Sequence, residues 1–139
     1  MATIEEIEAR RAERAKALAE ARAEQLGKDL EALDRLEEEH GTGRVVRVEV
    51  AAFTPGLPTC AIVCVPTEEA FKRLRDQLRR AKDGVARGAA QDLLGEVCRV
   101  YPDAQTYAAM RAKSPGLHDA VSVAAMRLAD AEAAEQGKG

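Results

Sequence analysis

The stretch Ala61–Asp76, AIVCVPTEEAFKRLRD, passes from an apolar segment to a charged one across a single proline. The segment before the proline is uniformly apolar, which is typical of a buried strand. Pro66 has no N–H to donate, so the hydrogen-bonded ladder of that strand should end there. Thr67 is placed to cap a helix whose first turn carries Glu68 and Glu69 beside the positive end of the helix dipole. We therefore expect a strand that leads directly into a helix.

A second strand is predicted just before this stretch. Val46, Val48 and Val50 alternate with charged residues, which is the period of a half-buried strand. Residues 54–58, TPGLP, contain two prolines and a glycine and predict a short connection. Two strands joined in this way form an antiparallel hairpin. Because a lone hairpin is only marginally stable in water, its apolar surface must be covered by helices of the same chain or by another protein.

The sequence after the charged helix predicts further helices. One spans about residues 85–100, after the charged helix ends near Asp83-Gly84. A short one is capped by Asp103, and a last one is capped by Ser114, with Pro115 in its first turn. In the first of these we expect four residues to point inward: Ala89, Leu93, Leu94 and Val97. Residues 131–139 should fray. The predicted fold class is α+β, mainly α, with a long N-terminal helix, one antiparallel β-hairpin and then about four helices.

Residues 1–41 form one long, charged helical pattern, which we interpret as an arm attached to an α+β body over residues 42–130. Thr3 fits an N-terminal cap, and Gly27 could bend the helix or split it in two. An apolar seam appears in its second half, at Leu26, Leu30, Leu33 and Leu36. The seam could fold onto the body, or it could pair with a second copy or a client protein. We favour the intermolecular role, since the half before the seam is too polar to be buried.

The composition limits the possible functions. The chain has 139 residues, a net charge of −3 and three cysteines. The charge gives no reason to expect nucleic acid or an anionic membrane. We see neither a membrane-length apolar run nor a signal peptide, so the prediction is a cytoplasmic protein with reduced thiols. Cys60 and Cys64 lie four residues apart in the predicted strand, about 13 Å, which is too far for one zinc ion, so we expect no metal and no cofactor.

No motif for catalysis is present. The glycines of GTGR, residues 41–44, follow a helix rather than link a strand to one, and His40 is far in sequence from His118. We therefore expect no enzyme. The charged helix carries a basic run, but interleaved acidic residues and the absence of aromatic platforms argue against nucleic acid. We favour a plain solvated face for it, with a protein partner as the alternative. The candidate protein-binding residues are Leu26, Leu30, Leu33, Leu36, Arg75, Arg79 and Lys82.

Three short motifs carry a family resemblance: Val65-Pro66-Thr67 with Phe71 four residues on, Tyr101-Pro102-Asp103, and Pro115-Gly116-Leu117. In this order, over about residues 43–130, they resemble the small tail assembly chaperones of long-tailed bacteriophages and prophages. The long arm departs from that pattern. The resemblance implies a non-enzymatic factor, without cofactor, that binds the apolar tape measure protein and keeps it soluble while tail tube subunits polymerise around it.

An alternative from a different class is a structural or adaptor protein of a virion or of a bacterial assembly. In that reading residues 1–41 would serve as an anchoring arm. Either protein would act by binding other polypeptides, and it could also form a homo-oligomer.

Overall fold

The computed structural model describes residues 1–137. Its elements confirm the α+β, mainly α fold class. In chain order they are α1 (Ile4–His40), β1 (Val45–Glu49), β2 (Cys60–Cys64), α2 (Glu68–Arg80), α3 (Gly84–Cys98), β3 (Arg99–Tyr101), α4 (Ala104–Lys113) and α5 (Leu117–Gly137). Helix α5 thus continues through Gly137, where the sequence predicts a frayed tail; residues 138–139 lie outside the described part.

The predicted hairpin is present, and a third strand extends it. β1 and β2 pair antiparallel with Val45 opposite Cys64 and Glu49 opposite Cys60. β3 pairs antiparallel with the other edge of β2, so the strand order is β1-β2-β3. The expectation of a two-stranded hairpin, with a helix running to about residue 100, was therefore incomplete. Three residues directly after a helix are too few to show a strand period, which explains the omission.

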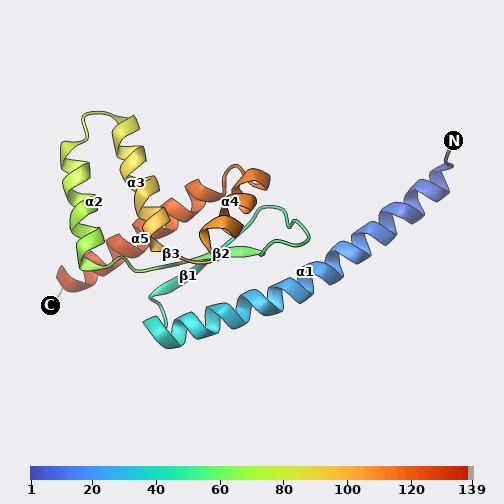
Figure 1. Cartoon of the computed structure of the whole chain (residues 1–139), viewed down its shortest axis with the longest axis horizontal. Helices are drawn as coiled ribbons and strands as arrows, with labels where there is room; N and C mark the ends of the chain where they lie inside the picture. The colour runs from blue at the N-terminus through green and yellow to red at the C-terminus, as the bar shows by residue number, and fades with distance from the viewer. Residues whose placement is uncertain (138–139) are drawn as a thin grey trace.

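Helices of the same chain cover both faces of the sheet. On one face, Ala32 and Leu36 of α1 form a small core with side chains of β1 and β2. On the other face, a larger core joins Ala61 and Val63 of β2 to the remaining helices. Four of the five β2 residues are buried as a result. The cover that the hairpin requires thus comes from its own chain, in a layered order of α1, sheet and helix group (Figure 1).

The predicted capping residues begin their helices as expected. Thr3 accepts a hydrogen bond from the N–H of residue 6, Thr67 from that of residue 70, and Asp103 from that of residue 106. Helix α2 ends at Arg80, and Asp83 caps α3 instead of closing α2. Ser114 was predicted to start the last helix, but its N–H closes α4. Gly41 ends α1 with φ of 102°, a value that favours glycine.

Helices α3 and α5 approach each other closely at Gly95. A Cβ added to Gly95 would lie 2.6 Å from Ser122 Oγ and 3.0 Å from its Cα. Only a residue without a side chain allows this separation. The contact fixes which side of α3 faces the body and leaves its other side outward.

Helix α1 is one continuous helix, so Gly27 does not split it. Residues 1–20 are all exposed, and Figure 1 shows this half of α1 extending far beyond the body, whereas the second half runs along the sheet. Only the first half is therefore an arm. Of the helices described, none combines the length and the apolar character needed to cross a membrane.

Candidate protein-binding surfaces

Asp29 attaches α1 to the sheet. This side chain has no exposed surface, yet it carries a carboxyl group. Its Oδ2 accepts hydrogen bonds from the N–H of Thr59, at 2.7 Å, and from the Thr59 hydroxyl. Its Oδ1 accepts from the Tyr101 hydroxyl at 2.6 Å and from Gln25 Nε2 at 3.0 Å. Burial and the bond to Asp29 both raise the pKa of Tyr101, so that its hydroxyl stays a donor. One acidic residue thereby connects α1 to the residue just before β2 and to the last residue of β3.

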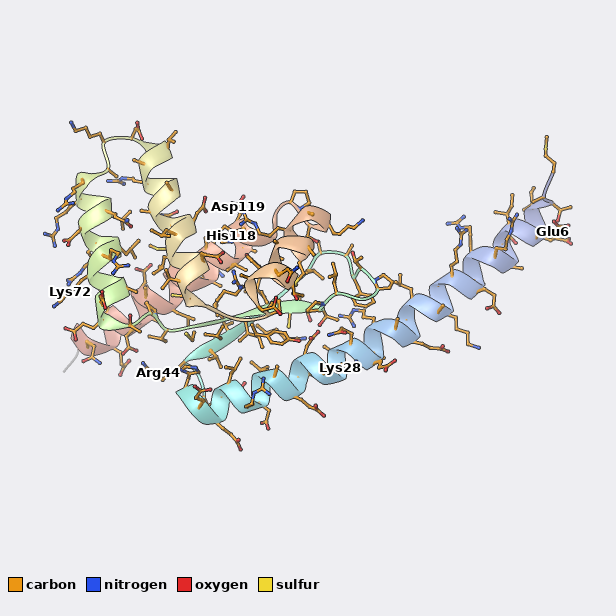
Figure 2. All side chains as sticks on the ribbon, in the orientation of Figure 1. Glu6, Lys28, Arg44, Lys72, His118 and Asp119 are labelled. Carbon is orange, nitrogen blue, oxygen red and sulfur yellow. The ribbon has the colours of Figure 1, made fainter. Side chains whose placement is uncertain are left out.

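The predicted leucine seam is divided by this attachment. Leu36 is 8% exposed and belongs to the core between α1 and the sheet, and Leu33 packs against that core. The intermolecular role predicted for the whole seam is therefore wrong for Leu36. Leu26 is half-buried, whereas Leu30 is 43% exposed. In Figure 2 Lys28 marks the point where α1 reaches the body, and Glu6 lies at the far end of the arm.

Helix α3 presents an apolar stripe to solvent. Val85 is 84% exposed, Leu93 45% and Val97 52%, and Ala89 between them is exposed too. These residues follow one another at intervals of four, so they lie along one side of the helix. The inward orientation predicted for four residues of this helix is wrong for Ala89, Leu93 and Val97. It is confirmed for Leu94, which is 3% exposed. Gly95 gives the reason, because it places the opposite side of α3 against α5.

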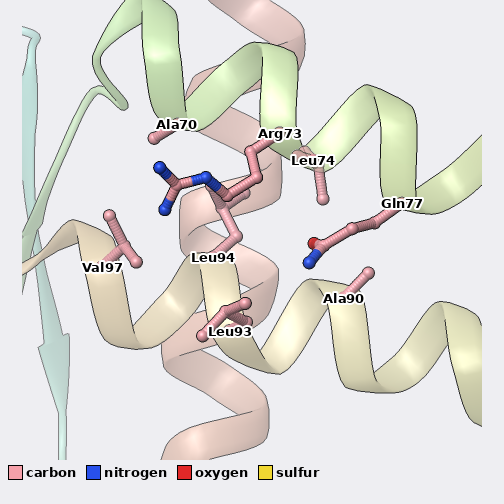
Figure 3. A pocket seen from close by; sticks show the side chains of 8 residues that line it. All are labelled: Ala70, Arg73, Leu74, Gln77, Ala90, Leu93, Leu94 and Val97. Atoms are coloured by element: carbon pink, nitrogen blue, oxygen red, sulfur yellow. The ribbon is translucent and has the colours of Figure 1, made fainter.

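Two hollows lie on either side of this stripe, and Leu93 lines both. Between α2 and α3 there is a small cavity of about 50 Å³, which Arg73 and Gln77 border from α2 and Val97 borders from α3 (Figure 3). Between α3 and α4 there is a cleft of about 560 Å³, bordered by Ala108 and others. Leu93 therefore forms an apolar ridge between two depressions. This shape suits the side chains of an apposed helix.

The floor of the larger cleft contains a chain of two hydrogen bonds that join three helices of the protein. The Tyr107 hydroxyl lies 2.6 Å from Nδ1 of His118, and Nε2 of His118 lies 2.9 Å from the carbonyl oxygen of Asp92. That carbonyl only accepts, so Nε2 carries the proton and Nδ1 accepts from Tyr107. Burial raises the pKa of Tyr107 to about 12, which keeps its hydroxyl protonated. His118 thus helps to hold α3, α4 and α5 together.

The predicted basic residues of α2 are brought together in part. Arg75 and Arg79 border a shallow hollow of about 420 Å³ with Arg87 of α3. The guanidinium of Arg75 also lies 5.1 Å from the ring centre of Phe71. Lys82 is exposed in the turn after α2 and does not line this hollow. Lys72 on the outer side of the helix, visible in Figure 2, forms an ion pair with Glu68 at 3.6 Å. The helix therefore offers a small basic patch at its C-terminal end.

The three thiols are free. Burial raises the pKa of Cys60 to about 11 and that of Cys98 to about 12, and it raises the pKa of the half-buried Cys64 as well. Thiols of this kind are poor nucleophiles at neutral pH. Within residues 1–137, no group of three His, Cys, Asp or Glu side chains is arranged to hold a metal ion.

Sequence reasoning missed the α3 stripe and Asp29. Leu93 and Leu94 are neighbours of equal hydrophobicity, so periodicity alone could not assign the buried side; the small residues Ala90 and Gly95 were the available signal. Asp29 stands three residues before Ala32 and seven before Leu36, and an acidic residue at that position of an apolar seam is unusual. Comparison with known proteins gives no match, whether to a family model, to a curated protein or to a solved structure.

Proposed function

We propose that this chain is a non-enzymatic, cytoplasmic protein-binding factor that acts like a phage tail assembly chaperone and keeps a tape measure protein soluble. The observation that supports the proposal best is the exposed stripe of α3 with a hollow on each side. Valine and leucine at 45% exposure or more, repeated along one helix, form a surface that gains from contact with another apolar surface. A tape measure protein, with long apolar helices, would supply such a surface.

The geometry of the stripe favours a helical client. From Val85 to Val97 the stripe covers about 18 Å of helix, or three turns. An amphipathic helix lying along it would place side chains at i, i+3 and i+7 into the hollows beside Leu93. Arg73, paired with Glu69, borders the hollow on one side, and the cleft on the other side is bordered by Asp92, Glu96 and Arg111. The polar rim of the stripe thus carries both charges and selects no sign of charge on the client.

A co-expression experiment tests this proposal. The tagged chain is produced together with a candidate tape measure protein, and soluble client is measured after affinity capture. We expect soluble complex with the wild type and at least a tenfold loss with Leu93→Glu, because a charge would then stand on the ridge. The matched control is Val123→Glu, since Val123 is 49% exposed on α5 and borders neither hollow. Insoluble client with the wild type, or equal loss with both variants, would contradict the proposal.

The alternative function, a structural or adaptor protein of a virion or bacterial assembly, is favoured by one observation, the exposed half of α1. An anchoring arm of this kind would keep the protein in the finished particle, whereas a chaperone leaves it. Mass spectrometry of purified particles therefore separates the two functions.

A further inference from the structure

We propose that the free side of α1 binds the same side of α1 in a second copy of this chain, with the two helices antiparallel. The side in question carries a heptad pattern over four repeats, which is the period of a two-stranded coiled coil. Its two sets of positions are Ala9, Lys16, Ala23 and Leu30, and Ala12, Ala19, Leu26 and Leu33. We call these eight residues the heptad seam.

The heptad seam lies beside the side of α1 that packs on the sheet and meets it at Leu33, which also contacts the core there. The sheet side is marked by the buried residues Asp29, Ala32 and Leu36. Leu30 follows Asp29 directly and so lies about 100° around the helix from it. Its 43% exposure shows that the body leaves the seam open at this point. A second helix therefore has room beside α1 at Ala23 and Leu30, and it would extend the contact that Leu33 already makes with the core.

The charges along α1 select a second copy as the occupant and fix its direction. Residues 9–16 contain four basic residues and one acidic residue, whereas residues 31–39 contain five acidic residues and one basic residue. In an antiparallel pair, the basic block of each helix lies beside the acidic block of the other, so the attraction occurs twice. A parallel pair would place like blocks together, which is unfavourable.

The best register sets small side chains against large ones. With the two-fold axis between residues 24 and 25, Ala19 faces Leu30 and Ala23 faces Leu26 of the second copy. Lys16 then faces Leu33, where its aliphatic stem covers the leucine and its ammonium group reaches the acidic block. In this arrangement the exposed arm of each copy covers the open seam of the other, which accounts for an apolar side chain as exposed as Leu30.

The proposal goes beyond the client-binding function and does not depend on it. The two bodies lie toward opposite ends of the paired helices, and the α3 stripe is no part of the heptad seam. The two proposals therefore fail independently: a change at Leu30 should dissociate the copies, and a change at Leu93 should not.

Light scattering after size exclusion tests the association on the full chain. At about 100 µM we expect a mass of about 30 kDa, twice the 15.0 kDa of one chain. Leu30→Glu should lower it to the mass of one chain with an unchanged circular dichroism spectrum of the body. Leu18→Glu is the matched control, because Leu18 has the same 43% exposure on the same helix but lies outside the seam. A monomeric wild type, or equal dissociation by both variants, would overturn the proposal.

A charge exchange supplies a second test. One variant replaces Arg10, Arg11 and Arg14 with Glu, and the other replaces Glu31, Asp34 and Glu38 with Lys. Each alone should be monomeric, since both of its contacts become like-charged, and an equimolar mixture should form a one-to-one dimer. A mixture that stays monomeric would overturn the proposal.

The direction of the pair is measured with a spin label on Ala15→Cys, beside the seam but not part of it, in a Cys64→Ala background. An antiparallel pair separates the two labels by about 28 Å along the axis, or 19 residues, whereas a parallel pair brings them to the same level. A short distance between labels would overturn the antiparallel arrangement.

Discussion

Replacing Asp29 with Ala should be among the most destabilising single changes in this protein. The carboxylate accepts the N–H and hydroxyl of Thr59 and the hydroxyl of Tyr101, and Thr59 is only 2% exposed. Without Asp29, at least two buried donors lose their acceptor, at about 1–3 kcal/mol each. No buried charge is left behind, since the partners of Asp29 are neutral donors, so the lost hydrogen bonds set the cost. We therefore expect the free energy of unfolding to fall by about 2–6 kcal/mol.

The assay is urea denaturation followed by circular dichroism. Measuring in the Leu30→Glu background removes the dependence on chain concentration that self-association would add. Asp34→Ala is the control, because Asp34 is exposed on the same helix and its loss should change stability by less than about 0.5 kcal/mol. A double-mutant cycle with Tyr101→Phe should give a coupling free energy of about 1.5–3 kcal/mol for the bond between these two side chains.

A small effect would refute this reasoning. If Asp29→Ala costs less than about 1 kcal/mol, the hydrogen bonds around the carboxylate do not outweigh its desolvation. If Asp29→Ala lowers the free energy of unfolding as expected but shows no coupling to Tyr101→Phe, the loss comes from the bonds to Thr59 alone. In that case the link between α1 and β3 would contribute nothing to the attachment.

Three further predictions concern other parts of the fold. Gly95→Ala should lower the free energy of unfolding by about 1–3 kcal/mol, because the added methyl group meets α5. Gly27→Ala should raise the free energy of unfolding by about 0.5–1 kcal/mol, because Gly27 has open space around it and alanine favours the helix. Urea denaturation measures both. Cys60 and Cys98 should resist a thiol reagent at pH 8 in the folded protein and react in urea, because burial raises the pKa of both thiols; rapid labelling of either in the native state would contradict their placement. Hydrogen bonds from the N–H and hydroxyl of residue 106 lower the pKa of Asp103 in the folded protein. The cap therefore stabilises the fold fully above the pKa that Asp103 has in the unfolded chain, and this stabilisation is lost as the pH falls through the lower pKa of the folded protein. Asp103→Asn should flatten that part of the stability–pH curve, and an unchanged curve would count against the cap.

Local chemistry explains why much of this fold was predictable. The passage from β2 through Pro66 to α2 depends on residues that are adjacent in sequence, and the same is true of the caps at Thr3, Thr67 and Asp103. Each cap is a bond between residues three apart, so no knowledge of the tertiary structure is required. The candidate site was harder to predict from the sequence, because it depends on which side of a helix meets another element.

Helix α3 shows where that limit lies. Its two apolar sides both satisfy a helical period, and only one of them meets α5. The choice depends on Gly95, whose missing side chain admits Ser122 from a helix about 27 residues away in sequence. β3 is a similar case, since Arg99 and Tyr101 become strand residues only because the edge of β2 is available to them.

Asp29 also connects the fold to the proposed interaction of the arm. Apolar contacts such as those of Ala32 and Leu36 are not directional, so they alone would allow α1 to shift along the sheet by one turn at modest cost. Hydrogen bonds to the N–H of Thr59 and to the Tyr101 hydroxyl do not survive such a shift, because each needs the carboxylate at one position. A buried carboxylate is a weak source of stability but a strong determinant of register. We infer that Asp29 fixes how much of α1 extends beyond the body, and therefore which leucine remains open to a second copy. Asp29→Leu tests this inference: stability should be partly kept by the apolar replacement, while the mass measured at a given concentration should fall because the two seams no longer meet in one register.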